Sequence, residues 1–238
     1  MAVKPGVGVY FPPVFPYIFV KTFIMIIEKT LIEDVLVIKP ELHEDERGYF
    51  YEVFNDKEFN EKTNWKYNFH TEQVNESHSV GNVIRGLHFQ RDEHAQAKLV
   101  RCTEGCVIDF AVDIREDSPT FGKFEYRALS SQNKEMFFVP KGFAHGFLVL
   151  SNEATFSYIC DEGYCKESEG GIRWDDPEIM FVNDTTTIPD LVDALIDSVE
   201  NVITSEKDRQ ALRLGEIMTG FNSKTLSYGY TNNAIDEQ

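Results

Sequence analysis

The sequence is poor in positive charge, with 23 lysine and arginine residues against 40 aspartate and glutamate residues and a formal net charge of −17. This excess of negative charge argues against a general surface for nucleic acid or anionic membranes. It does not exclude an anionic ligand, because a few basic side chains can reverse the local sign at one cleft. We therefore expect no nucleic-acid partner and no membrane partner.

Cysteine is also scarce, with four residues in 238. The Cys-x3-Cys and Cys-x4-Cys pairs lack the glycine and lysine context of a zinc ribbon, although a structural zinc site is the alternative. We interpret the four as reduced thiols on strands of a cytoplasmic protein, where they act as small apolar side chains. They are Cys102, Cys106, Cys160 and Cys165.

No apolar run is unbroken over the roughly 20 residues that a membrane-spanning helix needs. The strongest candidate, residues 6–27, is interrupted by three prolines and Lys21. It also lacks the cleavage site of a signal peptide. We predict that residues 1–24 form a non-catalytic N-terminal extension, with a membrane or interaction arm as the alternative.

Helical periodicity is rare before residue 185, whereas strand-like runs recur about every ten residues between glycine and proline turns. With 42% hydrophobic and 13% aromatic residues, eight or more such runs predict an all-β sandwich or jelly-roll barrel. Residues 189–200 show a helical period, so a helical segment should follow the barrel. Ligands of such barrels bind in the mouth, between inward-facing side chains.

Four ionisable residues, His88, Lys98, Asp109 and His145, lie in apolar strand-like runs. A buried ionisable group is unfavourable without a partner, so several on neighbouring strands predict one pocket with chemistry in it. The alternatives are a hydrogen-bonded core histidine for His88 and a strand-end lysine that snorkels to water for Lys98.

The strand that carries His88 also carries Arg85, and strict alternation places the two side chains on opposite faces. Gly86, one of the two residues between them, brings both side chains to one face if it forms a β-bulge.

Five motifs stand in order along the chain: Asp45-Glu46-Arg47-Gly48, Arg85-Gly86-Leu87-His88-Phe89-Gln90, Lys98-Leu99-Val100-Arg101, Gly142-Phe143-Ala144-His145-Gly146 and Ser205-Glu206-Lys207-Asp208. Together they resemble the dTDP-4-dehydrorhamnose 3,5-epimerase family. The resemblance implies a cupin jelly-roll barrel over residues 25–184. We expect a helix-containing insert over residues 185–208, packed on the barrel, and a C-terminal tail over residues 209–238.

The resemblance also implies a homodimer that uses no metal and no other cofactor. Its substrate would be a dTDP-4-keto-6-deoxyhexose, inverted at C3 and C5 to give dTDP-4-dehydro-L-rhamnose in nucleotide-sugar biosynthesis. It assigns His88 as the base, Asp208 as its partner, Tyr164 as the acid on the opposite face and Lys98 as the stabiliser of charge on the C4 oxygen. Asp109 would support the site, and the implied substrate contacts are Arg47, Glu52, Gln73, Asn75, Arg85 and His145.

The chemistry explains these residue types. The C3 and C5 protons flank the C4 ketone, so removal of either proton gives an enolate that must be reprotonated from the other face. A cation near the C4 oxygen stabilises the developing charge, and arginine suits bidentate contacts with a diphosphate. The segment before Asp208 is longer than is usual in the family, so it must return to His88 for the pair to form.

Three alternatives stay open. The first is a related epimerase that inverts one centre. The second is a metallo-cupin with His88 and His145 as ligands, although His88-Phe89-Gln90 lacks the His-x-His cluster of such proteins. The third is a non-catalytic cupin that binds nucleotide sugars.

Overall fold

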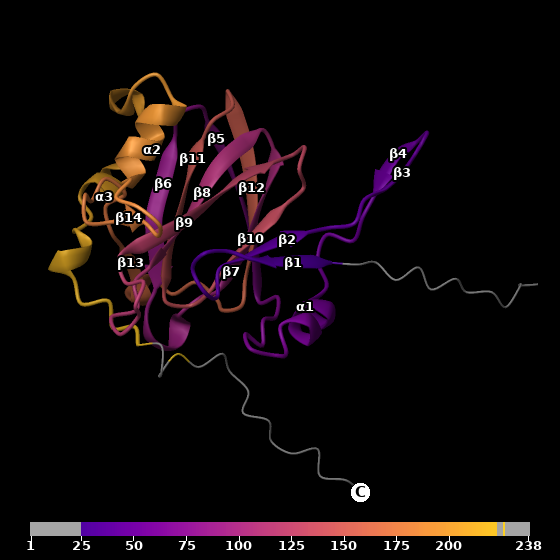
Figure 1. Ribbon diagram of the computed structural model, residues 1–238, viewed down its shortest axis with the longest axis horizontal. Helices are drawn as coiled ribbons and strands as arrows, with labels where there is room; N and C mark the ends of the chain where they lie inside the picture. The colour runs from indigo at the N-terminus through magenta and orange to yellow at the C-terminus, as the bar shows by residue number, and fades with distance from the viewer. Residues whose placement is uncertain (1–24, 223–225, 227–238) are drawn as a thin grey trace, which may run out of the picture.

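The computed structural model describes residues 25–222 and residue 226, so the predicted N-terminal extension lies outside the described residues. The described chain is built mainly of strands (Figure 1). The strands are β1 (Ile26–Lys29), β2 (Leu36–Lys39), β3 (His43–Asp45), β4 (Gly48–Phe50), β5 (Gln73–Val80), β6 (Ile84–Gln90), β7 (Lys98–Glu104), β8 (Cys106–Asp113), β9 (Lys123–Ser130), β10 (Met136–Val139), β11 (Phe143–Val149), β12 (Glu153–Cys160), β13 (Glu169–Gly171) and β14 (Met180–Phe181). The α-helices are α1 (Asp56–Lys62), α2 (Ile188–Leu195) and α3 (Glu206–Arg209).

Two six-stranded sheets form the barrel. One has the order β1-β2-β10-β7-β12-β5 and the other the order β13-β6-β11-β8-β9-β14. Neighbouring strands are antiparallel except β14 and β9, which are parallel. The predicted jelly-roll barrel, with short peripheral helices, is confirmed.

The space between the sheets is filled by one apolar cluster that both sheets supply. Val107 and Ala111 of β8 and Val100 of β7 belong to it, and the rings of Phe147 and Phe156 stack with centroids 4.2 Å apart. Because side chains two residues apart share a face of a strand, Asp109 and Lys98 lie on the same inner faces. The interior of the barrel therefore contains ionisable groups where the sequence pattern predicted them.

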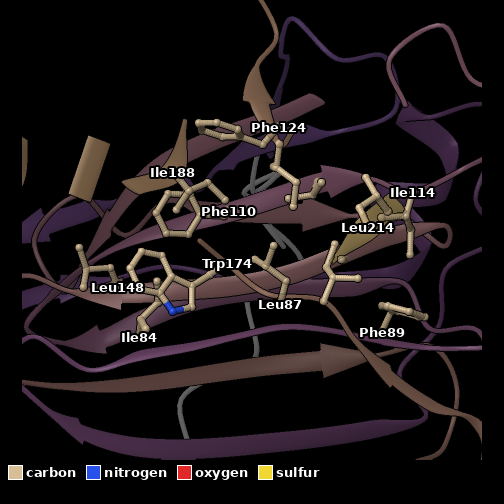
Figure 2. Close-up of a cluster of buried hydrophobic side chains, with 14 of the residues drawn as sticks. Ile84, Leu87, Phe89, Phe110, Ile114, Phe124, Leu148, Trp174, Ile188 and Leu214 are labelled. Atoms are coloured by element: carbon tan, nitrogen blue, oxygen red, sulfur yellow. The ribbon is translucent and has the colours of Figure 1, made fainter. Parts of the chain in front are cut away.

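A second apolar cluster covers the outer face of the β6–β11–β8–β9 sheet (Figure 2). Leu87, Phe110 and Phe124 of the sheet pack there against Trp174 and Ile188 from the segments that follow. Complete burial of such a side chain contributes about 1.5–3 kcal/mol. The C-terminal segment is thus attached to the barrel by apolar contacts.

Helix α2 begins at a capping box, in which the Thr187 side chain accepts from the Asp190 N–H while the Asp190 carboxylate accepts from the Thr187 N–H. Ile188 and Val192 are its buried residues. The helix ends at Leu195, before the end of the predicted period, and one 3₁₀ turn follows at Val199–Asn201.

Residues 209–222, expected as part of a tail, lie against the barrel. Leu214 and Phe221 are buried in the outer cluster, and the Thr219 hydroxyl donates to the Ile114 carbonyl at 2.7 Å. This segment directly follows α3, so it anchors the short helix that carries Asp208. In the part of the chain that is described, every helix falls short of what crossing a bilayer requires.

Strands β3 and β4 form a separate two-stranded sheet that projects from the barrel, away from α2 and α3 (Figure 1). Tyr49 and Phe50 on this hairpin are exposed. The hairpin is therefore a surface arm and not part of the barrel wall.

Candidate active site

A hollow at the barrel mouth consists of two adjoining lobes of about 460 and about 250 Å³. His88, Lys98 and Tyr158 line both lobes. Arg85, His145 and Asp208 border the larger lobe, whereas Gln73, Asn75 and Tyr164 border the smaller one. Eight of the predicted site residues and Tyr158 therefore meet in one hollow.

A β-bulge in β6 places Arg85 and His88 on the same side. His145 pairs with His88 and Phe147 pairs with Arg85, so two steps along β11 match three along β6. Gly86 in the bulge has a positive φ of 113°, and a Cβ atom there would lie 2.6 Å from the His145 carbonyl oxygen. Only glycine fits there, and of the two arrangements that the sequence left open, the structure has the one with the bulge.

His88 and Asp208 form a hydrogen-bonded pair, with Nε2 and Oδ1 2.6 Å apart. The Ser205 hydroxyl accepts from the Asp208 N–H at 3.1 Å, and the Gly86 N–H donates to Asp208 Oδ2 at 3.4 Å. Burial raises the pKa of the Asp208 carboxyl. The hydrogen bond to His88 and its charge, together with the hydrogen bonds to Gly86 and Ser205, lower the pKa by more, so it is lowered overall. The long insert does bring Asp208 to His88.

His145 and Asp109 form a second pair deeper in the barrel, with Nε2 and Oδ2 2.9 Å apart. Both side chains are buried. Burial raises the pKa of the Asp109 carboxyl, and the charges of His145 and Lys98 only partly oppose this. Because His145 lies opposite His88 in the sheet register, the two pairs are neighbours.

Lys98 lies at the junction of the two lobes. Burial lowers the pKa of its ammonium group, while the nearby Cys160, Asp109 and Glu169 raise it. The lysine faces the hollow, so the alternative of a snorkelling strand-end lysine does not hold. Its ammonium group is available to a bound carbonyl oxygen.

The remaining polar contacts are local. Arg85 Nε donates to the Ser79 hydroxyl at 2.9 Å, and the Gln73 amide donates to Asn75 Oδ1 at 2.7 Å. The Tyr164 hydroxyl donates to Glu169 Oε2 at 3.2 Å, and this tyrosine is 55% exposed.

Two predicted substrate contacts, Arg47 and Glu52, line neither lobe of the same chain. The Arg47 side chain is 85% exposed on the β3–β4 hairpin, and its Nε donates to Asp45 Oδ1 at 3.1 Å. Glu52 borders a separate small crevice beside Met25. The projecting hairpin keeps Arg47 away from this hollow, and Glu52 lies at a different place on the barrel.

Several residues of the hollow were not among the predicted site residues, and three of them are ionisable. Tyr158 of β12 lines both lobes, and Glu169 and Lys207 form an ion pair of 2.5 Å at the lobe edges. Strand alternation could have identified Tyr158, because it shares the inward face of β12 with the buried Phe156 and Cys160. Lys207 stands next to Asp208 in a motif already noted, whereas Glu169 carries no such signal.

Neither histidine pair is arranged as a metal site. Within residues 25–222 and residue 226, no group of three or more histidine, cysteine or acidic side chains could hold a metal ion. All four cysteines are free thiols, and burial raises the pKa of Cys102 and of Cys160 to about 11. Such thiols are unreactive at neutral pH.

Comparison with known proteins places this geometry in a family. The model of the dTDP-4-dehydrorhamnose 3,5-epimerase family matches residues 29–216. A relative of that name from Salmonella typhimurium is 48% identical over 167 residues, which are 70% of this chain and 90% of the relative.

Solved structures agree. The dTDP-4-dehydrorhamnose 3,5-epimerase of Elizabethkingia anophelis is 46% identical with a TM-score of 0.70, over 81% of this chain and 97% of that chain. A 3,5-epimerase of Legionella pneumophila in complex with dTDP-4-keto-L-rhamnose is 41% identical with a TM-score of 0.70, over 82% and 95% of the two chains. The chain therefore belongs to the dTDP-4-dehydrorhamnose 3,5-epimerase family.

Proposed function

We propose that the protein epimerises dTDP-4-dehydro-6-deoxy-D-glucose at C3 and C5 to dTDP-4-dehydro-L-rhamnose. The observation that carries the proposal is the His88–Asp208 pair, with its 2.6 Å hydrogen bond, at the junction of two lobes that Lys98 also lines. A base beside a lysine ammonium group is the arrangement that enolate formation next to a ketone requires.

His88 acts as the base in this proposal. Asp208 holds one ring nitrogen, which leaves the other to take a proton from C3 or C5. The lowered pKa of Asp208 keeps its carboxylate charged, so it stabilises the imidazolium that forms. Lys98 stabilises the negative charge on the C4 oxygen, because its ammonium group acts where little water competes. Arg85, at the edge of the larger lobe, is positioned to bind the diphosphate.

The acid that reprotonates the carbon can be either of two tyrosines. The sequence motifs assign Tyr164, which is half-exposed and donates to Glu169. The geometry favours Tyr158, which lines both lobes, whereas Tyr164 is 55% exposed and borders only the smaller lobe. A further observation supports it. A 3′-monoepimerase that is 26% identical to this chain was crystallised as a double mutant, in which a histidine and a tyrosine 70 residues apart are replaced. His88 and Tyr158 are separated by the same number of residues.

The two tyrosines can be separated by matched variants. We expect Tyr158→Phe to reduce complete epimerisation about 100-fold or more while hydrogen exchange at C3 or C5 persists, because general acid catalysis contributes about 10²–10⁴-fold. Tyr164→Phe should then raise KM and leave the product ratio unchanged. The reverse pattern would assign the acid to Tyr164.

Arg47 has a role in the proposed homodimer. The exposed Tyr49 and Phe50 make the β3–β4 hairpin an arm suited to a second copy of the chain. In this arrangement the hairpin of one copy brings Arg47 to the hollow of the other, where it binds the diphosphate.

Mixing two inactive variants tests this sharing. In a His88→Asn homodimer both sites lack the base, and in an Arg47→Ala homodimer both sites lack the arginine. Neither homodimer therefore contains a complete site. After unfolding and refolding together, random pairing leaves about a quarter of sites complete. We expect that fraction of wild-type activity, and a mixture as inactive as its parents would exclude sharing between copies.

Proton exchange tests the reaction itself. In deuterated water the substrate should take up deuterium at both C3 and C5, measured by NMR. Uptake at one carbon alone would identify a single-centre epimerase, and binding without any uptake would identify a non-catalytic nucleotide-sugar-binding protein.

A further inference from the structure

The loop 162–165 between β12 and β13 has no regular secondary structure, yet three glutamine side chains hold its backbone. Gln96 Nε2 donates to the Glu162 carbonyl at 2.8 Å. The Tyr164 N–H donates to Gln73 Oε1 at 3.0 Å, and the Cys165 N–H donates to Gln90 Oε1 at 2.9 Å.

Each of these glutamines stands two positions from a residue of the proposed site. Gln73 precedes Asn75 on β5, Gln90 follows His88 on β6, and Gln96 precedes Lys98 at the start of β7. Side chains two residues apart on a strand share a face, so Gln73 and Gln90 hold the loop against faces that line the hollow, while Gln96 holds it from the segment just before β7. All three glutamines border the smaller lobe, and Gln90 is almost completely buried.

The loop needs such support because it contains Gly163. This glycine has no atom within 4 Å of the place that a Cβ would take, so no packing restrains it. Glycine also has more freedom to lose on ordering than any other residue. The Tyr164 ring, at the rim of the smaller lobe, depends on this loop for its position.

We propose that Gln73, Gln90 and Gln96 are positioning residues that form a latch. The latch fixes Tyr164 as a wall of the smaller lobe before the substrate binds. This inference rests on the proposed function for the identity of the ligand. Its physical basis is preorganisation, because a wall that is ordered before binding does not lose that freedom when the ligand arrives.

Apolar replacements of nearly the same length remove the latch. Gln90→Met deletes an acceptor and Gln96→Met deletes a donor. We expect each to raise KM for the dTDP-sugar, and Kd for dTDP in calorimetry, about five- to tenfold, with kcat within about twofold of wild type, as the loss of one hydrogen bond implies. Gln132→Met, in the exposed β9–β10 turn, is the matched control.

Gly163→Ala should restore ligand affinity if the glutamine variants act by loosening the loop. It should not restore affinity if they act by damaging a strand. The site is open and the backbone there does not have a positive φ, so alanine reduces the freedom of the unlatched loop. Added to Gln90→Met, it should recover at least half of the lost affinity. Unchanged KM and Kd in both methionine variants, or a loss that alanine does not recover, overturns the latch.

Amide hydrogen exchange of residues 161–168 separates this proposal from the function. Both methionine variants should exchange faster there than wild type, whatever the substrate is. Unchanged exchange overturns the latch even in an active enzyme. If wild-type protein fails to epimerise the dTDP-sugar but exchange accelerates in the variants, the latch stands and the proposed function fails.

Discussion

The two histidine–carboxylate pairs contain the same groups in different surroundings. The His88 side chain is 34% exposed to the hollow, and its partner Asp208 comes from α3, on a segment that packs outside the barrel. The His145 side chain is 8% exposed, and its partner Asp109 lies on the adjacent strand inside the barrel. The first pair is widely open to a ligand on one side, whereas the second reaches the larger lobe only through the edge of a nearly buried His145.

The surroundings also set opposite directions of pKa shift. The pKa of Asp208 is lowered because hydrogen bonds and the charge of His88 outweigh burial. The pKa of Asp109 is raised because burial dominates. Within the proposed function, we therefore assign proton transfer to the first pair and the orientation of an imidazole to the second pair.

The largest effect should come from His88. We expect His88→Ala to lower hydrogen exchange at both C3 and C5 by at least about 10³-fold, because the base for both positions is removed. His145→Ala should lower it by about 10-fold to 100-fold. Deuterium uptake measured by NMR gives both values, and equal losses would remove the distinction between the pairs.

The inner faces of the strands were predictable from the sequence. Alternation along β8 places Asp109 with Val107 and Ala111, and the glycine between Arg85 and His88 indicated the bulge. These features are local, since they follow from spacing along one strand.

The approach of Asp208 to His88 was not predictable in this way. It depends on how Ile188 and Val192 of α2 pack against the barrel, which no local pattern specifies. The position of Arg47 depends on an arm that leaves the barrel, so the family motif assigned its role without giving its place relative to this hollow. Tyr158 was predictable by alternation, but a single tyrosine in a strand of mixed composition is a weak signal.

The carboxylates should differ in their effect on turnover. Asp208→Asn should lower kcat by about 10²–10³-fold, because the amide cannot stabilise an imidazolium. Asp109→Asn should lower kcat by only about 10-fold, through a less well oriented His145 and a Lys98 that loses a nearby negative charge. Steady-state kinetics on folded variants, checked by circular dichroism, measures both. A larger effect at Asp109 would reverse the assignment of the two pairs.

The smallest effect is on stability, where the two carboxylates should have opposite pH dependence. The pKa of Asp208 is lower in the folded state, so its contribution is present above the unfolded pKa of about 4 and is lost as the pH falls through the folded value. The pKa of Asp109 is higher in the folded state, so its contribution is present below about pH 4 and is lost as the pH rises through the folded value.

Urea unfolding of Asp208→Asn, Asp109→Asn and wild type between about pH 3 and about pH 6.5 measures the differences in stability, in which other titrating groups cancel. With rising pH the wild type should gain stability relative to Asp208→Asn and lose it relative to Asp109→Asn. If both stability differences change in the same direction with pH, burial does not dominate the pKa of Asp109. The His145–Asp109 pair would then resemble the His88–Asp208 pair.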